Sequence, residues 1–409
     1  MEYSSLRTIQ LKNKLRTKAS VNLGGDHPTA LGVLLGITQG QTSLEKEIEK
    51  ATLCEKYGVS TITDLSTDGT NDFRLHLINN ASQAIGTVPV YEFYYYWNKS
   101  EREQNSISEQ LIKIFEKQAL EGVDFFSIQA SLSSAILNKL NDSNRVIPIT
   151  SRGGAMMAEL MTRFNIENPL LSAYDTILDI CSSYNITLSL VGSLRPGTIA
   201  DSFNELHLEE LNFQMELAQR AAAKNVQVMI ELINHVPLNQ LEKYCKLSHE
   251  VFGGLPYGAL GPTPTDIAVD YDDVAGAIAA AQVVGMGISW INLVTSAEHS
   301  YFPVIQDLER ALKYYQIAFH VGNISRYNNI EQDFKLSKNR NLNNWQQIAK
   351  YSIFPEESSE KFNRLGYKIG QGCNLCDKQC PLVRTKIVEK RINKILEVNP
   401  NCKYVKHNV

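Results

Sequence analysis

Strand-like and helix-like segments alternate along most of this chain, and this alternation limits the fold more than any other feature. Short, near-continuous apolar runs are typical of parallel strands that are covered on both faces. Eight segments have this character: 30–36, 60–66, 85–91, 124–130, 146–152, 186–192, 226–232 and 289–295. The patterns between them are helical, as in 43–58, 107–122, 210–225 and 272–285.

Eight strands that alternate with helices predict an α/β protein of the (β/α)8, or TIM-barrel, type. The alternative is a doubly wound open sheet, but no glycine-rich dinucleotide fingerprint follows the first strand. We expect the barrel to span residues 29–317, after an N-terminal extension over 1–28. The chain then becomes polar and Asn-rich before further helical patterns, so we expect a helical C-terminal domain over 318–409.

Charge and hydropathy exclude several classes of partner. The formal net charge is −4, so no overall basic character indicates binding to nucleic acid or to an anionic membrane. No apolar run reaches the roughly 20 residues that a membrane span needs. The first residues contain no apolar core of signal-peptide length. We therefore expect a cytoplasmic protein whose thiols stay reduced.

Three of the seven cysteines form a tight group, C-x2-C-x3-C, at Cys373, Cys376 and Cys380. A structural zinc site usually has four ligands in two separated pairs, and only the distant Cys402 could complete one here. The ending C-x3-C-P also occurs in ferredoxin-type cluster sequences. We favour an iron–sulfur cluster over a zinc site or incidental thiols. Three cysteines on a four-iron cluster leave one iron open to a small molecule, which radical S-adenosylmethionine (SAM) chemistry requires.

Polar side chains gather where the predicted strands end, and the active site of a (β/α)8 barrel lies at the carboxyl ends of its strands. The residues at these positions are Asp64, Ser66, Tyr91, Glu92, Gln129, Ser151, Arg152, Gly153, Arg195, Glu231, Asn234, His235, Glu298 and His299.

Two of these groups indicate specific ligands. His235 and His299 follow neighbouring strands and could bind a metal that keeps open positions, although each could equally be an ordinary polar residue. The sequence SRGG at 151–154 precedes an apolar helix, so Arg152 and the N–H groups of that helix suit a phosphate. The alternative is an ordinary βα turn with a serine N-cap.

Several motifs in a fixed order resemble the phosphomethylpyrimidine synthase (ThiC) family, over about residues 30 to 380. They are DLST (64–67), IGTVPVY (85–91), SRGGAMMAELM (151–161), ENPL (167–170), SLRPGTIADS (193–202), VQVMIE (226–231), HVP (235–237), LGPTPTDIA (260–268), EHSYFP (298–303) and the cysteine group.

The resemblance implies a barrel with a C-terminal helical domain that holds a [4Fe-4S] cluster. It implies a homodimer in which each cluster domain reaches the partner's barrel, and an external electron donor. SAM on the open iron would yield a 5′-deoxyadenosyl radical. That radical would rearrange a phosphorylated imidazole ribotide, 5-aminoimidazole ribotide, into hydroxymethylpyrimidine phosphate.

The resemblance also assigns roles to individual residues. His235 and His299 match the ligands of a second metal, Zn²⁺ or Fe²⁺. Glu231 and Tyr257 match catalytic positions. The positions that match substrate-binding residues are Thr63, Tyr91, Gln129, Ser151, Arg152, Gly153, Arg195, Glu231 and Tyr257.

Some positions depart from the family pattern. Leu34 stands for an asparagine, Thr63 for a methionine, Gln129 for a histidine and Gly192 for an aspartate, and the last two cysteines are one residue closer together. These changes remove polar and titratable groups near the expected heterocycle. We therefore keep as alternatives a 5-hydroxybenzimidazole synthase-type reaction, a zinc-dependent barrel hydrolase and a non-catalytic ribotide-binding protein.

Overall fold

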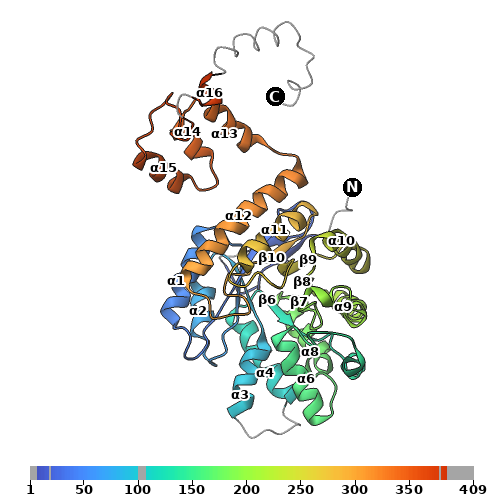
Figure 1. Ribbon diagram of the computed structural model, residues 1–409. Coiled ribbons are helices and arrows are strands. Elements are labelled where there is room, and N and C mark those ends of the chain that lie inside the picture. The colour runs from blue at the N-terminus through green and yellow to red at the C-terminus, as the bar shows by residue number, and fades with distance from the viewer. Residues whose placement is uncertain (1–6, 18–19, 100–106, 377–378, 385–409) are drawn as a thin grey trace. The chain divides into compact units, whose positions relative to one another are not determined.

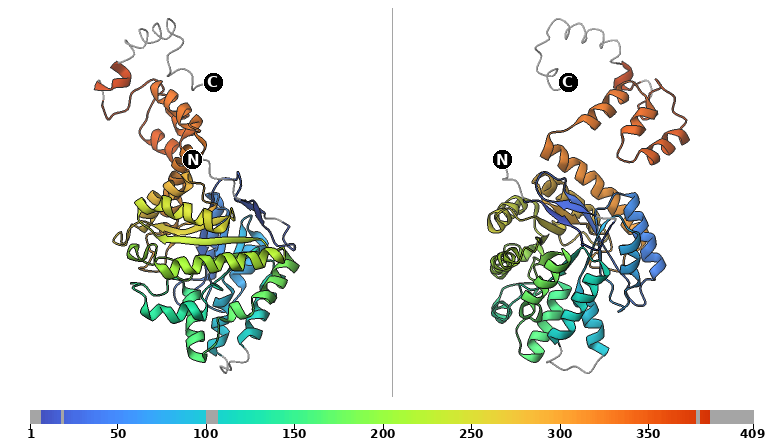
Figure 2. Two further views of the ribbon diagram at one scale, coloured as in Figure 1. Left: turned by 90° about the vertical axis from the view of Figure 1, so that its right-hand side faces the viewer. Right: turned by 180° about the vertical axis from the view of Figure 1, so that it is seen from behind.

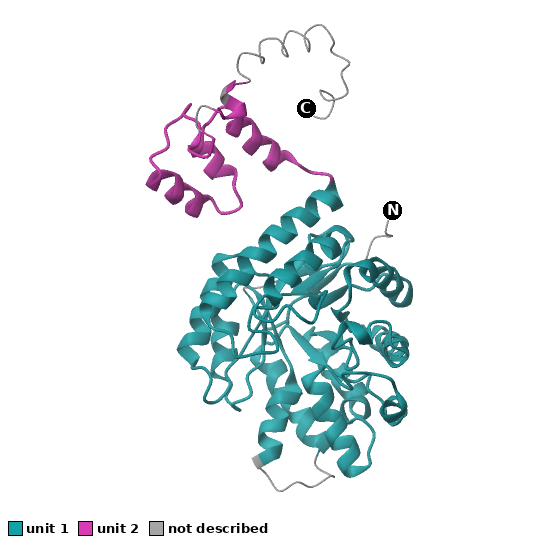
Figure 3. Cartoon of the chain, viewed as in Figure 1, with its two compact units in different colours: residues 1–327 teal, residues 328–409 magenta. Residues whose placement is uncertain are grey.

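The computed structural model describes residues 7–17, 20–99, 107–376 and 379–384. The chain divides into two compact units, residues 1–327 and 328–409 (Figure 3). Each unit is described by itself.

The first unit is built on eight parallel strands that close into a barrel in the order β10-β3-β4-β5-β6-β7-β8-β9. Closure confirms the predicted (β/α)8 fold, because an open sheet would leave two unpaired edges. The strands are β3 (Ala30–Leu35), β4 (Thr61–Asp64), β5 (Ala84–Thr87), β6 (Phe125–Ile128), β7 (Thr187–Val191), β8 (Val228–His235), β9 (Tyr257–Thr263) and β10 (Trp290–Asn292).

Helices surround the barrel (Figure 1). They are α1 (Leu44–Lys56), α2 (Asp72–Asn80), α3 (Pro89–Lys99), α4 (Ile107–Glu121), α5 (Ser134–Lys139), α6 (Arg152–Phe164), α7 (Pro169–Ser172), α8 (Tyr174–Tyr184), α9 (Glu205–Ala223), α10 (Leu238–Phe252), α11 (Asp272–Gly285) and α12 (Ile305–Tyr327). Two short 3-10 helices cover Leu140–Asp142 and Ile199–Asp201. Side-chain oxygens of Ser43, Ser151 and Asn204 cap the first turns of α1, α6 and α9.

The eight barrel strands include one that the apolar pattern missed, and they exclude one that it predicted. Segment 146–152 is not a strand. The N–H groups of Val146 and Ile147 instead donate to the Asp201 carboxylate, at 2.8 and 2.9 Å. The missed strand is β9, whose glycines and proline resemble a loop sequence. Gly258 is needed there because a Cβ at that position would lie 2.2 Å from the Trp290 ring.

The N-terminal extension forms a small hairpin that completes the barrel core. Its strands, β1 (Ile9–Leu11) and β2 (Val21–Leu23), pair antiparallel and lie across one end of the barrel, in dark blue in Figure 2. Leu11 and Leu23 are fully buried in a cluster with Trp290 and with other residues of the amino ends of the barrel strands. The hairpin therefore closes the end of the barrel opposite the expected active site.

The predicted division at 317/318 falls inside α12. This helix packs along α11 up to its last turns, with Ala318 and Gly322 buried, so the first unit ends at Tyr327 instead. The second unit contains α13 (Glu331–Asn341), α14 (Trp345–Tyr351), α15 (Pro355–Arg364) and α16 (Pro381–Arg384). No helix among the described residues combines the length and apolarity that crossing a membrane would require.

Candidate active site

A cavity of about 830 Å³ opens at the carboxyl ends of the barrel strands. It brings together most of the side chains that the sequence predicted for the site. Those that line it are Leu34, Thr63, Tyr91, Gln129, Ser151, Arg152, Arg195, Glu231, Asn234, Glu298 and His299. These residues come from seven strands and the segments that follow them, as expected for a (β/α)8 active site.

Arg195 and Glu231 form the polar centre of the cavity. Arg195 Nη1 lies 3.8 Å from Glu231 Oε1 and donates to the backbone oxygen of Gly192 at 2.6 Å. Its Nε donates to Asn234 Oδ1 at 3.1 Å. Burial raises the pKa of Glu231, and the Arg195 guanidinium opposes that shift. The carboxyl group is thus poised to hold or accept a proton from a bound ligand.

The amino terminus of α6 forms one wall. Ser151 caps the helix by accepting a hydrogen bond from Gly154 N–H at 3.3 Å, and Arg152 begins its first turn. The Arg152 guanidinium lies 5.3 Å from the centre of the Tyr91 ring, a cation–π distance. A helix amino terminus with an adjacent guanidinium suits a phosphate.

Gly153 does not line the cavity but allows Gln129 to lie against the helix. A Cβ on Gly153 would be 2.4 Å from Gln129 Oε1. Gln129 is buried, and its Oε1 has no hydrogen-bond partner among the residues that the structure describes. A buried amide without a partner favours a ligand that supplies one.

The two predicted histidines lie side by side, with ring centres 5.0 Å apart. His235 ends β8, and its Nδ1 is 2.6 Å from Asp266 Oδ1. Because a carboxylate only accepts, this contact places the proton on Nδ1 and leaves Nε2 free to bind a metal. Burial lowers the pKa of His235, which favours the neutral, ligating form.

The histidine pair fits a metal with open coordination positions. Within the described ranges, no group of three or more His, Cys, Asp or Glu side chains has metal-holding geometry. A metal here would therefore have two histidine ligands, and its other positions would go to water or substrate.

The cysteine group lies in the second unit. Cys373 and Cys376 are half-buried, Cys380 is buried, and all three are free thiols. Gln379 N–H donates a hydrogen bond to the backbone oxygen of Cys376 at 2.9 Å. Three cysteines are the donor set that an iron–sulfur cluster needs, but the described structure does not bring the three thiols into metal-holding geometry. The distant Cys402 lies outside the described residues.

Tyr257, predicted as a catalytic and substrate-binding residue, does not line the cavity. It begins β9 at the amino end of the strand, is fully buried, and bonds Cys245 of α10 rather than a ligand. Strand alternation explains the error, because the neighbouring Gly258 faces the barrel interior beside Trp290.

Several polar residues at the site were missed. Glu47, Lys50, Thr150 and Thr295 line the cavity. Asn292, on β10, donates to Glu231 Oε2 at 3.4 Å from inside the barrel. An asparagine in the apolar run SWINLVT was the available signal.

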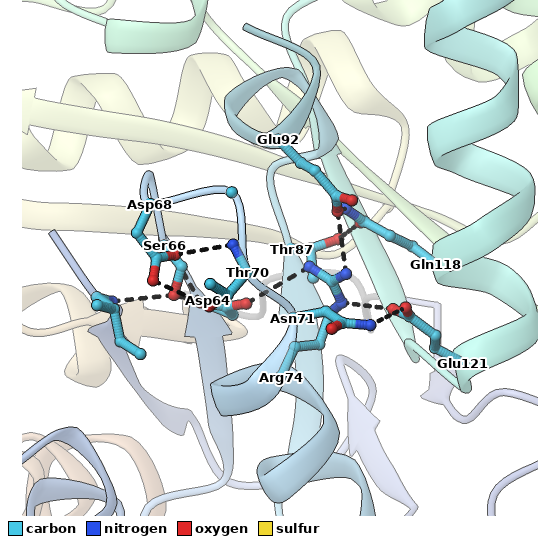
Figure 4. A network of polar contacts seen from close by, with 12 residues as sticks. Asp64, Ser66, Asp68, Thr70, Asn71, Arg74, Thr87, Glu92, Gln118 and Glu121 are labelled. Atoms are coloured by element: carbon cyan, nitrogen blue, oxygen red, sulfur yellow. Dashed lines mark hydrogen bonds and ion pairs between the residues drawn. The ribbon is translucent and has the colours of Figure 1, made fainter. Parts of the chain in front are cut away.

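A buried ion network supports the wall that carries Thr63 and Tyr91 (Figure 4). Arg74 of α2 contacts three carboxylates, with Nε 2.6 Å from Glu121 Oε2, Nη2 3.0 Å from Glu92 Oε2 and Nη1 3.7 Å from Asp64 Oδ2. Asp64 and Glu92 directly follow Thr63 and Tyr91 in sequence. Both carboxylates were predicted at strand ends, and they stabilise the wall from behind.

Comparisons with known proteins match most of the chain. A model described as the radical SAM ThiC family matches residues 4–387. The phosphomethylpyrimidine synthase of Finegoldia magna is 35% identical over 365 residues, which are 88% of this chain and 83% of that protein. The phosphomethylpyrimidine synthase of Pyrobaculum aerophilum is 33% identical over 381 residues, 92% of this chain and 88% of that protein.

Among solved structures, a 7,8-dihydropteroate synthase from Vibrio fischeri ES114 aligns with a TM-score of 0.42 and 13% identity, covering 76% of this chain and 97% of that one. The strand pairing alone establishes the barrel.

Proposed function

Because the chain belongs to the radical SAM ThiC family, we propose that it converts a phosphorylated imidazole ribotide into a rearranged heterocycle. Hydroxymethylpyrimidine phosphate is the proposed product, by a carbon–carbon lyase reaction. The observation that supports this most is the single cavity that joins the α6 amino terminus to the Arg195–Glu231 pair. One end suits a phosphate and the other a nitrogen heterocycle.

The α6 end would hold the substrate phosphate. The backbone N–H groups of the first helical turn have no intrahelical partners, and Arg152 adds a guanidinium beside them. A doubly charged phosphate would gain charge-assisted hydrogen bonds from both. The rest of the ribotide would then extend into the barrel mouth.

The Arg195–Glu231 end would orient the heterocycle and manage protons. Glu231 can accept a hydrogen bond from an amine or a ring N–H, and its raised pKa lets it take up a proton during bond rearrangement. Arg195 is held by Gly192 and Asn234, so it can bind a substrate oxygen without moving.

Cys373, Cys376 and Cys380 would hold a [4Fe-4S] cluster, and His235 and His299 would hold Zn²⁺ or Fe²⁺. A cluster held there, with SAM bound and an electron from an external donor, would supply the carbon radical that starts the rearrangement. We further propose a cytoplasmic homodimer in which the cluster domain of one subunit serves the barrel of the other.

Anaerobic incubation of the reconstituted enzyme with SAM and 5-aminoimidazole ribotide tests this function. We expect formation of 5′-deoxyadenosine together with loss of the ribotide. Absence of both would reject the substrate. Product analysis distinguishes the pyrimidine from 5-hydroxybenzimidazole. The second product stays a candidate because the neutral side chains Leu34, Thr63 and Gln129, which depart from the family pattern, line the cavity.

The same preparation separates the other classes of function. A zinc-dependent hydrolase would be colourless and free of iron after anaerobic purification, whereas a cluster protein absorbs visible light. A binding-only protein would keep its function after Cys376→Ser, whereas a radical enzyme would lose product formation completely.

A further inference from the structure

Glu210 is a buried carboxylate that no step above uses. It lies on α9, is fully buried and does not line the cavity. Its Oε1 accepts hydrogen bonds from Ser193 N–H at 2.7 Å and from Ser131 Oγ at 2.9 Å, and its Oε2 accepts one from Leu194 N–H at 2.7 Å. One side chain therefore ties the loop after β6 to the loop after β7.

The Ser193 peptide extends this connection to the phosphate end of the cavity. The Ser193 carbonyl oxygen accepts hydrogen bonds from Thr150 N–H at 3.1 Å and Ser151 N–H at 3.3 Å. The Ser193 side chain also packs so closely on α6 that a Cβ on Gly154 would lie 2.7 Å from it. The Ser193 carbonyl belongs to the same peptide unit as the Leu194 N–H that donates to Glu210, so one peptide unit joins Glu210 to the α6 N-cap.

The other peptide unit that Glu210 holds, through the Ser193 N–H, carries the Gly192 oxygen. Arg195 folds back so that its Nη1 reaches the Gly192 oxygen, and this geometry exists only while the 192–195 turn keeps its shape. Arg145 braces the same turn from outside through the Arg195 carbonyl oxygen, at 3.1 Å.

We propose that Glu210 is a positioning residue that sets the spacing between the Arg195 guanidinium and the α6 amino terminus, so that one phosphorylated ligand can contact both. The proposal rests on the function proposed above. Glu210 acts only through backbone groups and touches no ligand itself.

A carboxylate suits this role better than an isosteric amide. Both oxygens of Glu210 accept from peptide N–H groups, so a glutamine would direct an N–H toward one of these donors and lose that bond. The displaced peptide would move the turn that carries Arg195. A loss of this kind on a buried group is expected to weaken ligand binding about tenfold or more.

The test compares Glu210→Gln with Glu209→Gln in the full-length protein. Glu209 is the next residue of the same helix, and its contact with Lys139 lies on the surface, so it is the matched control. Ribose 5-phosphate binding is measured by calorimetry, and thermal unfolding is followed by circular dichroism. We expect Glu210→Gln to fold and bind about tenfold or more weakly, and Glu209→Gln to bind as the wild type does.

A folded Glu210→Gln protein with wild-type affinity would overturn the proposal while leaving the proposed function intact. If the wild type itself binds no ribose 5-phosphate, both fall. Should Glu210→Gln fail to fold, Ser131→Ala removes one of the three donors without touching α9. Weaker binding in that variant, with an unchanged unfolding temperature, supports positioning, and unchanged binding rejects it.

Discussion

Replacing Arg74 with methionine should destabilise the first unit strongly. The side chain is 3% exposed and contacts Glu121, Glu92 and Asp64. Removing one partner of a buried ion pair typically costs about 3–5 kcal/mol, because the remaining charge stays buried without compensation. Lys117 still lies 2.7 Å from Glu92, so we expect the lower end, about 3 kcal/mol at pH 7.

The pH dependence of this effect follows from Asp64. Burial raises the pKa of Asp64, and Arg74 opposes that shift. Without Arg74 the folded-state pKa rises further above the unfolded value. Stability from such a group is fully present below the unfolded pKa and is lost as pH rises through the folded pKa. The cost of Arg74→Met should therefore shrink as pH falls from 7 toward 5.

Urea unfolding at pH 7 and pH 5 measures both effects, with Lys113→Met as the control. Lys113 pairs with Glu109 on the surface, where both side chains are largely exposed, so its urea midpoint should not change. A cost below about 1 kcal/mol for Arg74→Met, or a cost that grows as pH falls, would refute the reasoning.

Three further predictions follow from the site and the barrel. Arg152→Met should weaken ribose 5-phosphate binding about 10- to 100-fold by calorimetry, because charge-assisted hydrogen bonds contribute about 1.5–3 kcal/mol; unchanged affinity would exclude the α6 amino terminus as the phosphate site. Asp266→Asn should lower Zn²⁺ affinity about 10- to 100-fold in chelator competition, because it releases His235; equal affinity would argue against the histidine pair. Burial raises the pKa of Asp124 from 3.8 to about 6, so the stability it contributes is lost as pH rises through about 6. Asp124→Asn should remove that slope from the urea midpoint between pH 4 and 6.5, and an unaltered slope would assign it to other groups.

The barrel was predictable because its strands are apolar on both faces, and that signal survives in a single sequence. The prediction of individual strands failed where packing, and not hydropathy, determines whether a segment forms a strand. Segment 146–152 looks like a strand, but Asp201 holds its first residues as a loop. In β9, Gly258 is needed because the Trp290 ring fills the space beside it. Tyr257 was misplaced for the same reason, since a sequence motif does not say which way a strand residue faces.

The candidate site was predictable where polar residues follow strands. Ser151, Arg152, Arg195 and Glu231 line the cavity as expected. The supporting residues were not predictable, because Glu210 lies in the middle of a helix and looks like any surface glutamate. Only the positions of the peptides that it contacts distinguish it from the exposed Glu209.

Closure of the barrel has a consequence for how the protein must be made. β3 pairs with both β4 and β10. One edge of this first barrel strand therefore stays unpaired until β10, the last barrel strand, has been synthesised. Translation at about 5–20 residues per second leaves this edge open on the ribosome for roughly 10–50 s. During that time the N-terminal hairpin also lacks Trp290, against which it packs. Unpaired strand edges are prone to aggregation, so the yield of soluble protein should depend on synthesis rate and chaperone supply.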